Sequence, residues 1–254
     1  MTRARTPATR TDGAVCLTKG MANKQSAQSA QSAQSAQSAQ SAQSAQSAQQ
    51  FGVGGSSPSA SLRPMLNVYM IRHGEAAAAW GGGDADPGLS ERGREQALAA
   101  RDALLALPEA LRPGRVVSSP LRRCRETAQV YAEAIGVEVE IDPAVGEVPT
   151  PAGVAAGERG PWLRKAIAGK WSEVEGDRDY AEWRRGVAEA VAGHRGAAVF
   201  SHYVAINAAV SWATADEHVL VARPENASIT TFAATPDGSL TLVELGAQGA
   251  TQVL

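Results

Sequence analysis

From residue 66 onward, the sequence alternates short apolar runs with segments of helical periodicity. The apolar runs have the length and composition of buried strands. They lie at residues 66–71, 115–118, 137–141 and 197–200. The helical segments lie at about residues 90–107, 120–135, 179–192 and 204–212, with a partly helical stretch from Pro161. This alternation predicts an α/β fold, a three-layer α/β/α sandwich with a mainly parallel, Rossmann-like sheet.

Capping and turn residues set the expected ends of these elements. Ser90 is the expected N-cap of the first helix, and Ser119, followed by Pro120 in the first turn, is the expected N-cap of the second. Gly136 is expected to end that second helix. Two late strands, at residues 228–233 and 240–245, are expected to join through a turn at Pro236-Asp237-Gly238.

The first 65 residues differ from this pattern. Between Gln25 and Ala48 the triplet Gln-Ser-Ala repeats eight times, which leaves almost no side chain that could build a core. We therefore expect residues 1–65 to form a disordered, low-complexity extension and residues 66–254 to form one folded domain. Met21 and Met65 could each begin translation, so whether residues 1–64 belong to the native protein stays open.

Charge and cysteine content exclude some classes of partner. The formal net charge is −2, and because residues 1–65 carry +5, the remaining residues carry −7. Such an acidic body argues against nucleic-acid binding. No run of about 18 apolar residues occurs, so no membrane partner or span is expected. Cys16 and Cys124 form no CxxC pair, which favours a reducing, cytoplasmic location.

Three of the predicted strands end in polar residues that can carry chemistry. These ends are Arg72-His73-Gly74-Glu75, Ser118 to Arg123, and Ser201-His202-Tyr203. In a parallel sheet the three ends face one crevice, where two imidazoles and at least two guanidiniums meet. A tetrahedral phosphoryl group suits the planar fork of arginine, and an imidazole can act as a nucleophile toward phosphorus.

These residues resemble the histidine phosphatases, also called the phosphoglycerate mutase-like superfamily. The resemblance rests on Arg-His-Gly at residues 72–74, DPGLSERGREQA at residues 86–97, SSPLRRCRETA at residues 118–128, and a late Ser-His after a strand. It implies a phosphoglycerate mutase-like fold and a histidine phosphatase catalytic domain over residues 66–254. It also implies that His73 is transiently phosphorylated, while Arg72, Arg123 and His202 bind the phosphoryl oxygens.

The resemblance also implies a carboxylate that acts as general acid. Glu147 matches that position, and Glu75 is a second candidate because it lies close to the nucleophile in the sequence. Nearby cations would lower the pKa of such a carboxyl unless it is partly desolvated, so we expect Glu147 at the outer edge of the pocket. Tyr203 stands where the family usually has glycine, and it could either crowd the pocket or contact substrate through its hydroxyl.

No metal or other cofactor is expected. The four histidines show no ligand spacing, and His194 and His218 are interpreted as structural or solvated. Cys124 lies on the apolar face of its predicted helix and is expected to serve only packing. Asn226, just before a predicted strand, could orient a hydrogen bond in the site or shape the entry turn.

The leading functional hypothesis is a metal-independent phosphatase that hydrolyses phosphomonoesters through a phosphohistidine. Its expected partner is a phosphorylated small-molecule or phosphoprotein substrate. One alternative is phosphoglycerate mutase-type transfer, which the residues 76–79, all alanine, disfavour because they offer no hydrogen-bonding side chain. Another is a noncatalytic phosphate-binding or scaffold protein. Specificity is expected in residues 143–176 and in the loop at residues 80–83, and the sequence leaves the substrate and the oligomeric state open.

Overall fold

The fold was analysed in a computed structural model that describes residues 66–78, 84 and 86–249. The extension expected at residues 1–65 and the loop expected at residues 80–83 lie outside the described residues, so those two predictions stay as predictions. Within the described ranges, no helix is long and apolar enough to cross a membrane.

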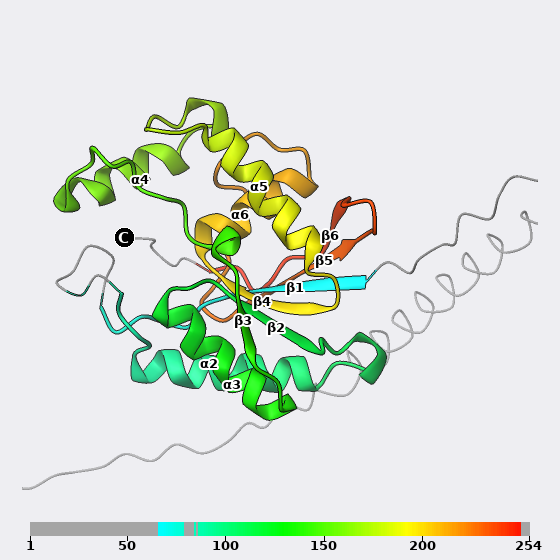
Figure 1. The fold of residues 1–254 in the computed structure, drawn as a ribbon. Coiled ribbons are helices and arrows are strands. Elements are labelled where there is room, and N and C mark those ends of the chain that lie inside the picture. The colour runs from blue at the N-terminus through cyan, green and yellow to red at the C-terminus, as the bar shows by residue number, and fades with distance from the viewer. Residues whose placement is uncertain (1–65, 79–83, 85, 250–254) are drawn as a thin grey trace, which may run out of the picture. The chain divides into compact units, whose positions relative to one another are not determined.

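The described residues build a six-stranded sheet with the order β3-β2-β4-β1-β5-β6. The strands are β1 (Leu66–Arg72), β2 (Arg115–Ser118), β3 (Val139–Ile141), β4 (Ala197–Ser201), β5 (Ile229–Ala234) and β6 (Leu240–Glu244). The first four strands pair in parallel, while β5 and β6 add an antiparallel edge. The mainly parallel α/β sandwich predicted from the alternation is thus confirmed (Figure 1).

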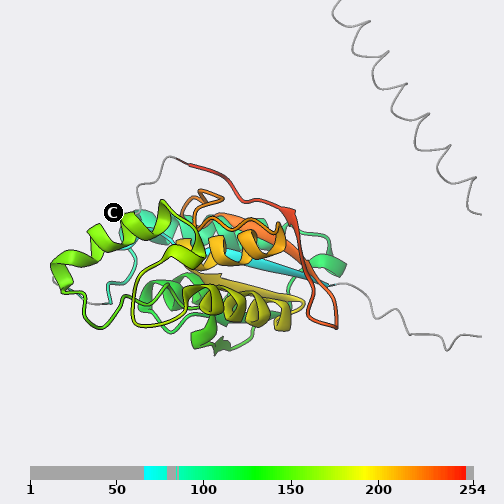
Figure 2. The same ribbon diagram turned by 90° about the horizontal axis from the view of Figure 1, so that it is seen from above.

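Helices cover both faces of this sheet. They are α2 (Glu91–Leu105), α3 (Arg122–Ile135), α4 (Arg159–Ile167), α5 (Tyr180–Gly193) and α6 (Tyr203–Ala213), with short 3-10 helices η1 (Glu109–Leu111), η2 (Pro143–Val145), η3 (Ala156–Glu158) and η4 (Trp171–Glu173). Figures 1 and 2 show α2 and α3 against one face and α5 and α6 against the other, with α4 extending beyond the sheet.

Alternation along β1 explains the two cores. Val68 and Met70 pack with α5 and α6, whereas Tyr69 and Ile71 pack with α2 and α3. Successive side chains of a strand point to opposite faces, so a strand covered on both sides must be apolar throughout. Helix α6 is buried along nearly its whole length, from Tyr203 to Ser211, as its apolar sequence predicts.

Most of the predicted element ends are confirmed, and one is wrong. The Ser90 hydroxyl accepts a hydrogen bond from Gly93 N at 2.9 Å, and Gly136 ends α3 with φ of 72°. The expected cap at Ser119 is wrong, because α3 begins at Arg122 after Leu121 and has no side-chain cap. The Ser119 hydroxyl instead lies 2.8 Å from a ring nitrogen of His202.

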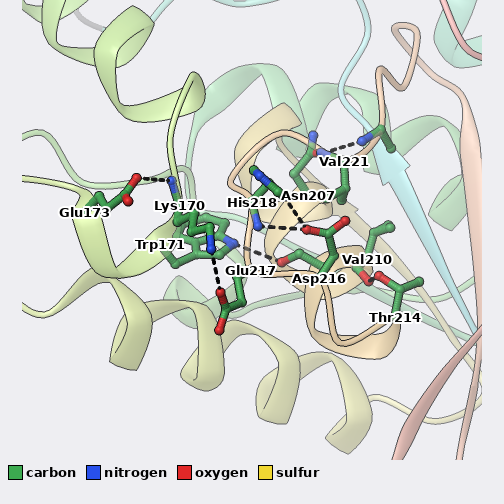
Figure 3. Close-up of polar contacts among 12 residues, drawn as sticks. Lys170, Trp171, Glu173, Asn207, Val210, Thr214, Asp216, Glu217, His218 and Val221 are labelled. Atoms are coloured by element: carbon green, nitrogen blue, oxygen red, sulfur yellow. Dashed lines mark hydrogen bonds and ion pairs between the residues drawn. The ribbon is translucent and has the colours of Figure 1, made fainter.

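The segment after β3 is fixed to the connection that follows α6. Trp171 donates its backbone N–H to Glu217 O at 3.0 Å, and its indole N–H to the Ser211 hydroxyl at 2.9 Å. Lys170 Nζ lies 3.0 Å from a carboxylate oxygen of Glu217 (Figure 3). Trp171 is buried and packs in the core.

Two glycines allow the loop after β1 to lie directly on α2. A Cβ atom added to Gly93 would meet Glu75 O at 2.1 Å, and one added to Gly74 would meet Gly93 O at 2.4 Å. Both obstacles are backbone atoms, which cannot rotate away. The Arg-His-Gly turn is therefore held against the start of α2 by backbone contact.

Replacing Gly93 with alanine is expected to lower the free energy of unfolding by roughly 1–3 kcal/mol, because the added methyl group overpacks this contact. Gly186→Ala is the matched control, since Gly186 lies in α5 with no atom within 4 Å of the added Cβ. That change should raise the free energy of unfolding by about 0.5–1 kcal/mol. Urea unfolding measures both values, and equal effects in the two variants would contradict the backbone contact.

Candidate functional site

The strands that end in polar residues are neighbours in the sheet. Arg72 of β1 lies opposite Ser201 of β4, and Ser118 of β2 lies opposite Phe200 of β4. The three strands are parallel, so their carboxyl ends meet at one edge of the sheet. The arrangement brings the segments around residues 73, 123 and 202 together, as expected from the sequence.

His73 is buried and held in one tautomer. Its Nδ1 lies 2.7 Å from Gly74 O. A carbonyl oxygen can only accept a hydrogen bond, so Nδ1 carries the proton. Its Nε2 therefore carries the lone pair of the ring, and this lone pair accepts a hydrogen bond from Arg123 Nε at 3.2 Å. Burial, with the positive charge of Arg123, lowers the pKa of His73 to about 3. At neutral pH this imidazole is an uncharged potential nucleophile.

His202 lies beside His73, with their ring centroids 5.2 Å apart. Arg123 Nη2 lies 3.2 Å from His202 Nδ1, so one guanidinium bridges both imidazoles. Burial lowers the pKa of His202 well below its ordinary value, and the neighbouring His73 and Arg123 add to this effect. Two neutral rings and one cation thus share a buried space.

Arg72 supplies a second buried cation. Its Nη1 donates to Pro224 O at 2.9 Å, while its Nε has no hydrogen-bond partner among the described residues. A buried unpaired donor is costly, so such a group marks a place where a ligand atom can bind. The guanidinium carbon lies 4.9 Å from the ring centroid of Tyr203. Tyr203 therefore supports Arg72 through its ring, a contact that sequence reasoning did not anticipate.

Glu147 follows η2 and lies close to this cationic group. Its side chain is half-buried, and its carboxylate accepts a hydrogen bond from Val148 N at 2.9 Å. Burial raises the pKa of Glu147, although Arg123 and Arg72 both oppose the rise. Desolvation thus outweighs the neighbouring cations in setting the direction of this shift.

Glu75, the other carboxylate candidate, is bound to the start of α2. The Ser90 hydroxyl donates to Glu75 Oε1 at 2.8 Å, and Arg92 lies 3.8 Å from Oε2. These contacts indicate that Glu75 stabilises the N-terminal end of α2.

Other residues form an outer layer that sequence reasoning missed or left open. The Thr127 hydroxyl accepts from Gly74 N at 3.0 Å and donates to Arg123 O at 2.7 Å, so it links the segments that hold His73 and Arg123. Asn226 Nδ2 donates to His73 O at 3.0 Å, which favours the site-orienting interpretation of this residue. Cys124 was expected to serve packing alone; its sulfur is buried, but it also lies 3.3 Å from His202 Nε2.

The remaining histidines lie elsewhere, in contact with carboxylates. His194 Nε2 lies 2.7 Å from Asp142 Oδ2, and His218 Nδ1 lies 2.7 Å from Asp216 Oδ1. Over residues 66–78, 84 and 86–249, no group of three or more histidine, cysteine, aspartate or glutamate side chains could hold a metal ion.

Burial of two neutral imidazoles makes stability depend on pH. An unfolded histidine has a pKa of about 6.5 and His73 a pKa of about 3, so between these values the unfolded chain binds more protons. The free energy of unfolding should therefore fall as pH decreases below about 6.5, by about 2 kcal/mol per imidazole between about pH 7 and about pH 5. Urea unfolding at the two pH values measures the drop, and His73→Gln should shrink it. An equal drop in the variant would contradict a neutral buried His73.

The family comparison agrees with this geometry. Residues 68–247 match the sequence profile described as the histidine phosphatase superfamily (branch 1). The chain belongs to the histidine phosphatase superfamily. The convergence of residues 72–74, 123 and 202 at one sheet edge brings together three of the four motifs on which the sequence resemblance rests.

Curated relatives of this chain include mutases by name. A probable phosphoglycerate mutase GpmB of Erwinia tasmaniensis is 37% identical over 87 residues, which covers 33% of this chain and 39% of the relative. The corresponding protein of Serratia proteamaculans is 39% identical over 89 residues, with the same coverage. The similarity therefore spans well under half of each relative.

Solved structures with the same fold include phosphatases. A mycobacterial glucosyl-3-phosphoglycerate phosphatase is 25% identical, with a TM-score of 0.57, over 73% of this chain and 100% of that chain. A phosphoserine phosphatase from Entamoeba histolytica is 21% identical, with a TM-score of 0.55, over 74% of this chain and 98% of that chain. The second likeness shows a common fold. Together the comparisons leave both phosphatase and mutase chemistry within the family.

Proposed function

We propose that this histidine phosphatase superfamily member hydrolyses phosphomonoesters through a phosphorylated His73. The main observation behind this proposal is that Arg123 bridges the two neutral imidazoles. Beside them, the buried Nε of Arg72 has no hydrogen-bond partner among the described residues. This arrangement offers a nucleophile together with positive charge for a tetrahedral anion. The phosphatase likeness in structure supports the hydrolytic form of the chemistry.

In the first step, His73 Nε2 attacks phosphorus and the bond from phosphorus to the alcohol oxygen breaks. The lone pair is available because the ring proton sits on Nδ1, held by Gly74 O. Arg72 and Arg123 stabilise charge on the equatorial phosphoryl oxygens, and His202 positions the Arg123 guanidinium by accepting its hydrogen bond at Nδ1. The leaving alcohol oxygen takes a proton from Glu147, a carboxyl whose pKa is raised by burial.

In the second step, water attacks phosphorus and the bond from phosphorus to His73 Nε2 breaks. Glu147, now deprotonated, accepts a proton from that water, so the carboxyl returns to its starting form. Inorganic phosphate leaves, and His73 is again neutral. The reaction takes place on a phosphorylated small-molecule or phosphoprotein substrate in a cytoplasmic setting, both of which are part of this proposal.

Glu147→Gln should slow hydrolysis of alkyl phosphates, whose alcohols need a proton to leave, by about 100-fold in kcat. Hydrolysis of p-nitrophenyl phosphate should fall much less in its first step, because p-nitrophenolate leaves without a proton. Glu75→Gln is the matched carboxylate control and should preserve the ratio between the two substrates. If Glu75→Gln changed the ratio between the two substrates more than Glu147→Gln does, the general acid would be Glu75 instead.

The test of the proposed function is release of inorganic phosphate from p-nitrophenyl phosphate and from a panel of phosphorylated metabolites. Conversion of 3-phosphoglycerate to 2-phosphoglycerate, measured in the same samples, tests the mutase alternative, which the names of the curated relatives favour. Thermal stabilisation by phosphate or vanadate without turnover of any substrate would indicate the noncatalytic binding protein.

A further inference from the structure

An open pocket lies beside the proposed phosphate site. Its volume is about 410 Å³, and it is lined by Leu220, Val221, Ala222, Arg223, Gln248 and Gly249. The side chains of residues 220–222 are apolar, while Arg223 carries a positive charge. The wall formed by residues 248 and 249 pairs with the chain at Arg223, because Gly249 N donates to Arg223 O at 3.0 Å.

The pocket adjoins the phosphate site through Arg223 and Pro224. The carbonyl of Pro224 accepts from the Arg72 guanidinium at 2.9 Å, so the residue after Arg223 touches one of the proposed phosphate ligands. Arg72 in turn lies against the ring of Tyr203. A phosphomonoester held by Arg72 would therefore have this pocket within reach of its alcohol part.

The apolar wall is held in place before any ligand binds. Asn207, buried in α6, accepts hydrogen bonds at Oδ1 from Val221 N at 2.9 Å and from Ala222 N at 2.8 Å (Figure 3 shows the contact with Val221). Its Nδ2 donates to Tyr203 O at 2.9 Å. One side chain thus ties the pocket wall to the first turn of the helix that follows His202, and a preformed wall binds ligand with little ordering cost.

The charge of the pocket indicates the kind of ligand. The Arg223 side chain is exposed and forms no ion pair within the described part of the chain, whereas other exposed arginines, such as Arg115 and Arg185, do. The Glu225 carboxylate lies beside Gly249, another residue that lines the pocket. A ligand that places an apolar body on residues 220–222 and a carboxylate on Arg223 would satisfy both surfaces.

We propose that this pocket binds the alcohol part of the substrate, and that the preferred substrates are phosphomonoesters whose alcohol combines an apolar body with a carboxylate that pairs with Arg223. This inference rests on the proposed phosphatase function and adds a substrate class to it. It is independent of which carboxyl acts as general acid.

The test compares kcat/KM for 3-carboxyphenyl phosphate and 4-carboxyphenyl phosphate with kcat/KM for phenyl phosphate. In the unmodified protein, at least one carboxylated ester should be preferred over phenyl phosphate. In Arg223→Ala the preference should fall about fivefold, the effect of losing one exposed ion pair. Arg223→Glu should reverse it in favour of 3-aminomethylphenyl phosphate. Comparing each variant with the unmodified protein cancels the intrinsic reactivity of each ester.

Arg115→Ala is the matched control, because Arg115 is an exposed arginine at the opposite end of β2. It removes the same charge from the protein and should leave the preference unchanged. An unchanged preference in both Arg223 variants, with phenyl phosphate still hydrolysed, would overturn the pocket assignment alone. If the unmodified protein hydrolysed neither phenyl phosphate nor either carboxylated ester, the proposed function itself would be overturned. The two failures are therefore distinguishable.

Discussion

His73→Gln is expected to abolish turnover of phosphomonoesters, with kcat lower by at least about 10⁴-fold, because the covalent intermediate forms on the lone pair of His73 Nε2. Glutamine keeps a polar side chain near Gly74 O but offers no ring nitrogen to attack phosphorus. Binding of phosphate or vanadate should persist, since Arg72 and Arg123 remain. The measurements are initial rates with p-nitrophenyl phosphate and thermal stabilisation by vanadate.

His194→Gln is the matched control for this change. His194 is also a largely buried histidine, but it contacts Asp142 rather than the arginines of the site. Its replacement should change stability and leave kcat within a few-fold, because surface and scaffold contacts do not reach the reacting atoms. Turnover of His73→Gln close to that of His194→Gln would contradict a nucleophilic role for His73.

Arg123→Ala is expected to lower kcat/KM by about 10³-fold, since one guanidinium contacts both imidazoles and would bind the transferring phosphoryl group. The variant should also raise the pKa of His73, because the charge of Arg123 is one cause of its low value. The acidic limb of the pH-rate profile should therefore move to higher pH. The kcat/KM of Arg123→Lys should lie between that of the unmodified protein and that of Arg123→Ala, because lysine keeps the positive charge but lacks the planar fork of arginine.

The neighbouring Arg122 provides the control for Arg123. It is exposed, and it pairs with Glu126 at 2.7 Å on the outer surface of α3. Arg122→Ala should leave the pH-rate profile unchanged and cost less than a few-fold in kcat/KM. A comparable loss of kcat/KM in Arg122→Ala and Arg123→Ala would mean that both substitutions act by disturbing helix α3. The guanidinium of Arg123 would then have no special role in the site.

The convergence of the site could be predicted because it follows from strand order alone. Residues 72, 118 and 201 each end an apolar run, and parallel strands bring such ends to one edge of a sheet. The strands themselves were recognisable because burial on both faces requires continuous apolar sequence. The elements that position His73, Arg123 and His202 were therefore available from local patterns.

Long-range polar contacts could not be predicted from local patterns. Ser119 has the local signature of a helix cap, yet its hydroxyl contacts His202, which lies 83 positions later in the sequence. Cys124 has the spacing of a core residue, and only the fold brings its sulfur beside the same ring. A hydroxyl or thiol carries no sign in the sequence of which distant partner it will meet.

The segment between β3 and α5 was predicted least well. The sequence predicted only a partly helical stretch from Pro161, and the fold has three short 3-10 helices and α4 there. The pKa of Glu147 depends on the balance between desolvation and two cations contributed by β1 and α3, a balance that requires coordinates. The pocket at residues 220–223 was not anticipated either, because its wall forms through Asn207 of α6.

The most direct measurement is the site of covalent phosphorylation during turnover. Rapid acid-free quenching of the protein with a phosphomonoester, followed by mass spectrometry of peptides and ³¹P NMR, identifies the modified atom. Our account predicts an acid-labile phosphate on Nε2 of His73 that water removes within the catalytic cycle and that is absent in His73→Gln. Full turnover without any phosphate on His73, or a phosphate on another residue, would contradict it.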